Sequence, residues 1–137
     1  MSEENTAQSA EQEVEKSLAN QVKSFEGAPA NDQIEAWKQE HGDVFASAFS
    51  DTELLMWRSV ARVEFSELQN AAMQADPPLT QFQMEERLVR LCLLWASPDA
   101  MNALDKKAGS MTTLHEQILL NSNFMDPRLA ATLVTKL

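Results

Sequence analysis

The 137-residue sequence predicts a mainly α domain, small and helical, with a short β-hairpin near its N-terminal side and a flexible acidic N-terminal arm. Three observations lead to this fold class. Apolar residues return every three or four positions through most of residues 60–137, which is the period of an amphipathic helix. Two short apolar runs flank Ser50-Asp51, the pattern of a hairpin. The first 31 residues are rich in Glu, Gln, Ser, Ala and Asn and contain few large apolar side chains. The chain length fits one domain, placed at residues 32–137.

The N-terminal arm is placed at residues 1–31. Eight acidic and two basic side chains lie in residues 1–36, so this region carries −6 of the formal charge of −10. Such a segment buries too little apolar surface to offset the entropy of ordering, and we expect disorder. A helix that forms against the domain or a partner is the alternative. It would carry an apolar stripe spaced four, four and three residues apart: Val14, Leu18, Val22 and Phe25.

The first elements of the domain follow from local signals. Asp32 is the expected N-cap of a short helix over residues 33–38, which His41-Gly42 closes. The hairpin is predicted over residues 43–58, with a helix in this region as the rival prediction. Ser59 is then the expected N-cap of a helix from Val60 to about Ala75. Asp76-Pro77-Pro78 ends that helix because Pro cannot continue its hydrogen-bond ladder.

The second half predicts four more helices. Thr80 opens a helix over residues 81–96, which is apolar on every side at residues 91–95 and should be the buried centre of the fold. Ser97-Pro98 starts a helix that runs to Lys107, with Gly109 beyond its end. Thr113 and Glu116 fit a capping box for the next helix. Asp126-Pro127 starts the last one, whose apolar stripe is Leu129, Leu133 and Leu137.

Charge and composition limit the functions. A formal charge of −10 and a pI near 4.5 repel polyanions, so no direct nucleic acid binding is expected. No apolar run approaches the roughly 20 residues needed to cross a bilayer, so no membrane partner is expected. The N-terminus is polar and acidic, unlike a secretory leader. We expect a soluble intracellular protein.

The sequence contains no recognisable catalytic constellation, and no catalytic, cofactor-binding or metal-binding residue is predicted. Glu85-Glu86 at a helix start is expected to complement the helix dipole. Cys92 and His115 could form a nucleophile and base, but a cysteine in the middle of an apolar helix favours a buried, unreactive thiol. Two isolated histidines are weak evidence for metal. An enzyme with an acidic cleft and an acidic DNA mimic are the remaining alternatives, motivated by the carboxylate excess.

Trp57, Arg58 and Arg62 are the candidate partner-binding residues of the N-terminal half. Trp and Arg are the side chains that most often anchor protein interfaces, and a cationic spot is distinctive in so acidic a chain. The alternative is a core Trp with the two Arg pairing Glu53, Glu64 or Glu67 on the surface. Leu129 and Leu133 of the last helix are the other candidate partner-binding residues.

Four segments together resemble small virion-assembly proteins of long-tailed bacteriophages, described as tail assembly chaperone-like or as virion structural proteins. They are Ile34–Lys38 followed by His41-Gly42 and Val44-Phe45; Met56–Phe65; Glu86, Val89 and Cys92–Trp95; and Thr113–Leu119 with Phe124. The resemblance implies a non-enzymatic protein that binds other phage tail or virion proteins, with a possible homo-oligomer. It implies location in the host cytoplasm or in the virion. A chaperone would cover exposed apolar segments of the tape-measure protein, and a structural component would stay in the particle as a ring or an adaptor.

Overall fold

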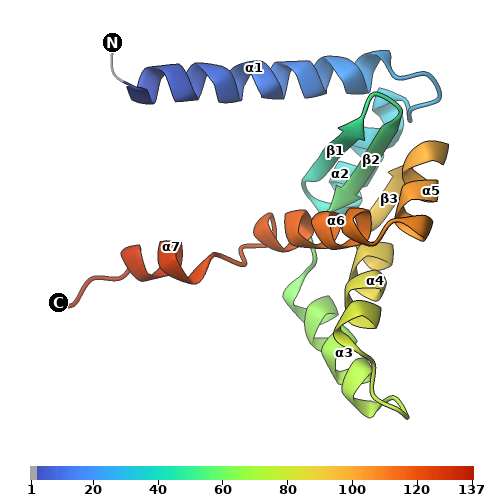
Figure 1. Ribbon diagram of the computed structural model, residues 1–137, viewed down its shortest axis with the longest axis vertical. Helices are drawn as coiled ribbons and strands as arrows, with labels where there is room; N and C mark the ends of the chain where they lie inside the picture. The colour runs from blue at the N-terminus through green and yellow to red at the C-terminus, as the bar shows by residue number, and fades with distance from the viewer. Residues whose placement is uncertain (1–2) are drawn as a thin grey trace.

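The computed structural model describes the backbone of residues 3–137, and all of their side chains except those of residues 3–9, 11, 14 and 15. Helices dominate, as predicted, and one small sheet lies at the centre (Figure 1). The elements in chain order are α1 Glu3–Ser24, α2 Asn31–His41, β1 Val44–Ser50, β2 Glu53–Arg58, α3 Arg62–Gln74, α4 Gln81–Cys92, β3 Leu93–Ala96, α5 Pro98–Lys106, α6 Ala108–Leu120 and α7 Pro127–Thr132.

The sheet is antiparallel, with the strand order β1-β2-β3. β1 and β2 form the predicted hairpin, in which Phe45 lies opposite Trp57. Ser50 pairs with Glu53, so the loop consists of Asp51-Thr52 and not of Ser50-Asp51 as predicted. A two-residue loop at this place keeps the apolar residues of β2 directed at the core.

The predicted helix over residues 81–96 is wrong in its last turn. α4 ends at Cys92, and the next four residues form β3 on the free edge of β2. Leu55 pairs with Ala96 and Met56 with Trp95. β2 is buried on both faces, so its second row of backbone N–H and C=O groups needs protein partners. The strand supplies them, and an apolar run of this length fits a buried strand as well as a helix.

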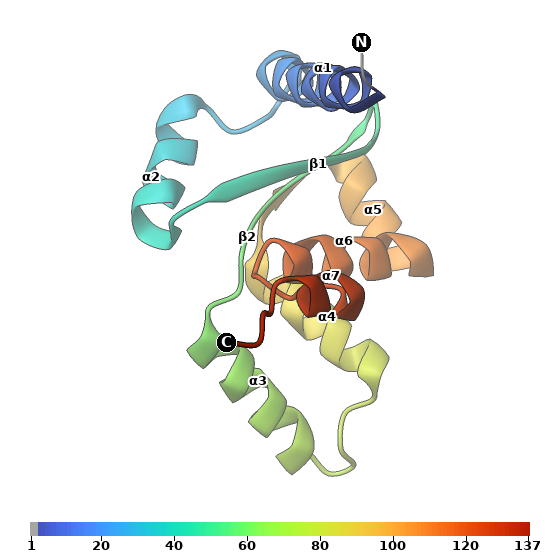
Figure 2. The same ribbon diagram turned by 90° about the vertical axis from the view of Figure 1, so that its left-hand side faces the viewer.

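The core lies between the sheet and the helices α4, α5 and α6. In Figure 2 the sheet stands between α2 on one side and α5 and α6 on the other. β2 contributes Leu55 and Trp57, and α6 contributes three fully buried or nearly buried side chains at helical spacing. The remaining members come from α4, α5 and the link after β2. The complete cluster is Leu55, Trp57, Val60, Leu88, Val89, Cys92, Ala100, Leu104, Met111, Leu114 and Ile118.

Ser97 joins the sheet to α5. Its Oγ accepts hydrogen bonds from the backbone N–H of Leu54 (3.0 Å) and of Ala100 (3.4 Å), and it donates to the carbonyl of Thr52 (2.8 Å). The N-cap predicted at Ser97-Pro98 is therefore confirmed, and the serine is fully buried. One hydroxyl caps the helix and also ties its first turn to β2.

Three predicted helix starts are wrong by one or more residues. α2 begins at Asn31 with Ala30 as its N-cap, so Asp32 lies inside the first turn. α3 begins at Arg62 rather than after Ser59, because Glu64 reaches back to accept a hydrogen bond from the N–H of Ala61 (3.1 Å). α6 begins at Ala108 and not at Thr113. Its added turn brings Met111 into the core, one turn before Leu114.

The N-terminal segment forms a helix, the alternative that the sequence left open. The Gln21 side-chain amide donates to the carbonyl of Ser50 (3.1 Å), and the Phe25 ring lies edge-on to Trp95 with centroids 6.0 Å apart. Leu18 and Val22 of the predicted stripe are half-buried, whereas the Val14 side chain lies outside the described residues. These contacts hold the C-terminal end of α1 against the sheet, and its N-terminal end extends away from the body (Figure 1). The mobility of this arm stays a prediction.

Candidate protein-docking surface

Trp57 lies in the core and not on a docking surface. Its ring stacks on Phe45 with centroids 4.8 Å apart, and only 2 % of the residue is exposed. The indole N–H donates to the Ser47 hydroxyl (2.8 Å), which in turn donates to the Gln117 side-chain oxygen (2.6 Å). These two hydrogen bonds give each of the three polar side chains a partner and link β1, β2 and α6. The core alternative of the sequence is the one observed.

Arg58 is likewise buried, because it forms a two-pronged ion pair with Glu64. Its two terminal nitrogens lie 2.7 and 2.8 Å from the carboxylate oxygens. The hydrogen bond from Arg58 holds the pKa of the Glu64 carboxyl below its ordinary value of 4.5. The same carboxylate accepts from the N–H of Ala61 at the start of α3. The pair therefore fastens the end of β2 to the beginning of α3.

The other predicted partner-binding residues are exposed. Arg62 is the first residue of α3, and no ion pair forms at it among the described residues. Leu129 and Leu133 lie in or directly after α7, with 55 % and 63 % of their surface exposed. The structure does not bring all five candidates together: two are internal, one begins α3, and two lie in or directly after α7, which extends from the body (Figure 1).

The structure adds residues that sequence reasoning missed. Seven of the eleven large apolar side chains that are exposed in the described part of the chain lie in residues 120–137, which we call the C-terminal segment. The sequence held one signal of this exposure, namely two consecutive apolar residues in a helix. Only one of two such neighbours can face the core, so the other is expected to be exposed. Leu119 packs against the core while Leu120 is exposed. The seven are Leu120, Phe124, Met125, Leu129, Leu133, Val134 and Leu137.

The C-terminal segment leaves the body through a defined turn. The N–H groups of Ser122 and Phe124 both donate to the carbonyl of Leu119, and Asn123 has a positive φ of 68°. The Phe124 ring contacts Phe65 of α3 with centroids 5.0 Å apart. Asp126 then caps α7 by accepting from the N–H of Arg128 (2.7 Å). The turn and the cap give the segment a local structure although its apolar side chains face solvent.

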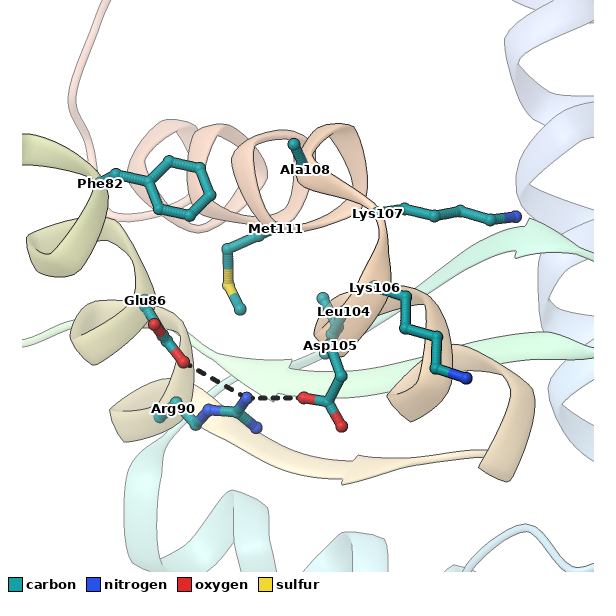
Figure 3. A pocket seen from close by; sticks show the side chains of 9 residues that line it. All are labelled: Phe82, Glu86, Arg90, Leu104, Asp105, Lys106, Lys107, Ala108 and Met111. Carbon is teal, nitrogen blue, oxygen red and sulfur yellow. Dashed lines mark hydrogen bonds and ion pairs between the residues drawn. The ribbon is translucent and has the colours of Figure 1, made fainter.

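A cavity of about 290 Å³ lies between α4, the end of α5 and the beginning of α6 (Figure 3). The Arg90 guanidinium lies in its wall, 2.8 Å from Asp105 and 3.5 Å from Glu86. Leu104 and Met111 supply the apolar part of the lining. Both carboxylates of the lining are paired with Arg90, and the lining residues include no nucleophile placed next to a base.

The residues considered for catalysis have structural contacts instead. Burial raises the pKa of the Cys92 thiol to about 11, which makes it a poor nucleophile near neutral pH. Burial lowers the pKa of His115, whose Nδ1 lies 3.9 Å from Glu85. Glu85 and Glu86 both lie beyond the first turn of α4 and contact side chains, so the predicted interaction with the helix dipole is wrong.

Two properties bear on metals and membranes. Among the residues that the structure describes, no three His, Cys, Asp or Glu side chains gather in a way that could hold a metal ion. No helix within residues 3–137 is both long and apolar enough to span a membrane.

Comparison of the chain with protein-family models, with curated proteins and with solved structures finds no match.

Proposed function

We propose that this chain is a non-enzymatic phage protein that acts by protein–protein contact in tail or virion assembly, in the manner of a tail assembly chaperone. The observation that supports a binding role is the exposed apolar character of the C-terminal segment. Monomeric proteins rarely leave large apolar patches in water, and such patches typically mark interaction sites. The phage assignment rests on the four-segment resemblance.

The form of the C-terminal segment favours a helix-in-groove contact. α7 has only six residues, and an isolated helix of that length is unstable in water. Leu129 and Leu133 are four residues apart and would lie on one face of a longer helix. Burial of these side chains by a partner would supply the free energy that the isolated segment lacks. The partner surface we propose is an apolar groove of another tail protein, exposed before assembly.

Retention in the mature virion as a ring or adaptor protein is the second candidate. It uses the same segment, since a permanent interface also needs apolar anchors. The two candidates differ in location: a chaperone stays in the host cytoplasm, and a structural component appears in the particle. Mass spectrometry of purified particles beside the lysate separates them. A fixed copy number in particles supports the structural role, and abundance in lysate alone supports the chaperone.

The binding role is tested with tagged chains in infected cells. We expect the wild-type chain to retain tail proteins and Leu129→Asp/Leu133→Asp to lose most of them, because a charge cannot enter an apolar groove without a large desolvation cost. Glu67→Lys, an exposed change on α3, is the control. Equal recovery of tail proteins by all three chains, or recovery of none by the wild type, contradicts the proposal.

A further inference from the structure

Two arms extend from the same side of the body. In Figure 1, α1 and the C-terminal segment both leave the body toward the left, with α1 at one end of the long axis and α7 nearer the middle. Figure 2 looks at this side and shows the two helices one above the other, both directed at the viewer. The N-terminal end of one arm and the C-terminal end of the other are thus free to meet a single partner.

The two arms are complementary in charge. Residues 3–24 contain five Glu and two Lys, which gives α1 a net charge of −3. The C-terminal segment contains one acidic residue, Asp126, and two basic residues, Arg128 and Lys136, so its net charge is +1. The rest of the chain, residues 1–119, has a net charge of −11, and the two parts together give the formal charge of −10. The C-terminal segment is therefore a cationic part of a strongly acidic molecule. Its attraction is directed at acidic surfaces, and α1 is one of them.

The arms also match in apolar character. Leu18 and Val22 of α1 lie where the helix end is held against β1 by Gln21, and both side chains are half-buried, so part of each stays in contact with solvent. Leu129 and Leu133 present an equally spaced pair on the other arm. Two amphipathic helices of this kind can bury their stripes against each other. Contact between two copies of α1 is unfavourable by comparison, since both are acidic.

We propose that two copies of this chain pair reciprocally, with α1 of each copy lying along the C-terminal segment of the other. A half-turn about an axis perpendicular to the plane of Figure 1 exchanges left with right and top with bottom. It therefore places the α1 of one copy beside the C-terminal segment of its partner, and the reverse contact forms at the same time. Such a closed two-fold contact is the commonest form of homo-oligomer. The inference rests on the proposed role of the C-terminal segment as a docking element.

Charge reversal tests this pairing in the full-length chain by sedimentation velocity over a range of concentrations. Arg128→Glu/Lys136→Glu changes the C-terminal segment from +1 to −3, and Glu11→Lys/Glu13→Lys/Glu15→Lys changes α1 from −3 to +3. We expect a wild-type dimer and a loss of about tenfold or more in its association constant for either change alone. Both changes in one chain restore opposite charges and should restore the dimer. Glu67→Lys on α3 is the control and should leave the association constant unchanged.

Several outcomes would overturn the pairing. A monomer at every concentration excludes it, and so does a dimer that responds to the C-terminal change but not to the α1 change, which would indicate contact between two C-terminal segments. Failure of the combined variant to recover also excludes it. A wild-type monomer that still retains tail proteins through Leu129 and Leu133 removes only the second copy as partner. A dimer that retains no tail protein removes the assembly role and leaves the pairing intact.

Discussion

Arg58 and Glu64 show how a hydrogen-bonded partner offsets the desolvation penalty of a buried charge. The guanidinium donates two hydrogen bonds to the carboxylate and a third to the carbonyl of Ser59 (3.2 Å). A two-pronged pair of this geometry is among the strongest ionic contacts in proteins. Removal of one member would leave the other charge partly buried and unpaired, which is the main penalty.

Glu64→Gln should destabilise the protein by about 1–3 kcal/mol, since a hydrogen bond to a charged group is lost. Because the folded pKa of Glu64 is depressed, the stabilisation is complete above about pH 4.5 and disappears as the pH falls through the lower folded value. Urea unfolding between pH 3 and 7 measures both effects. Glu86→Gln is the matched control: it weakens an exposed contact with Arg90 and should cost below about 0.5 kcal/mol. Equal costs for the two variants would contradict this account.

The reactivity of the Cys92 thiol measures whether the core around α4 is closed. With its pKa raised from 9.0 to about 11, the thiol should resist Ellman's reagent in the folded protein at pH 8 and react only as the chain unfolds in urea. The sign of the shift also predicts that its stabilising contribution is complete below about pH 9 and is lost as the pH rises toward 11. Rapid labelling without denaturant would show that the core around α4 opens.

At the scale of whole elements, the N-cap Ser97 of α5 should contribute more to the free energy of unfolding than the N-cap Thr80 of α4. Ser97→Ala should cost about 2–4 kcal/mol because it removes a cap and leaves the N–H of Leu54 and the carbonyl of Thr52 without that partner. Thr80→Ala removes an exposed cap, the acceptor for the N–H of Gln83 (3.2 Å), and should cost about 1 kcal/mol. Thermal unfolding of the two variants measures the difference. Similar losses would mean that the link between β2 and α5 adds nothing to the cap.

The sequence predicted elements well where a local signal decides them. Ser97-Pro98 and Asp126-Pro127 start helices as expected, and Gly42, with a φ of 89°, ends α2. β3 could not be predicted because it depends on a partner strand distant in the sequence: Leu55 pairs with Ala96, and only the free edge of β2 makes residues 93–96 a strand. The start of α6 depends in the same way on the core position of Met111. Long-range pairing overrides local propensity in both places.

The candidate docking residues likewise differ in whether local sequence or distant neighbours decide their role. Trp57 and Arg58 have the composition of an interface anchor, and that composition also suits a core Trp and a buried ion pair. Their surroundings decide between these roles, and the surroundings come from β1, α3 and α6. Leu129 and Leu133 were predictable as a stripe, but their exposure depends on the turn at residues 121–123, which directs α7 away from the body.

The whole molecule combines a packed body with two extended arms that add little to its core. All of the described core residues lie between Leu55 and Ile118, so residues 3–31 and the C-terminal segment lie outside this cluster. The acidic arm and the apolar arm have opposite effects on solubility: the net negative charge of the first increases it, and the exposed apolar side chains of the second decrease it.

The body and the C-terminal segment should therefore differ sharply in their response to substitution. We expect Leu129→Asp/Leu133→Asp to change the free energy of unfolding by less than about 0.5 kcal/mol at concentrations where the chain is monomeric, since these side chains are already in water. Ile118→Ala, in fully buried surroundings on α6, should cost about 2–5 kcal/mol. Urea unfolding measures both, and hydrogen exchange should show α7 amides exchanging far faster than those of α6. A large loss of stability in the Asp variant would mean that α7 packs against the body in solution, and the segment would then be closed to partners.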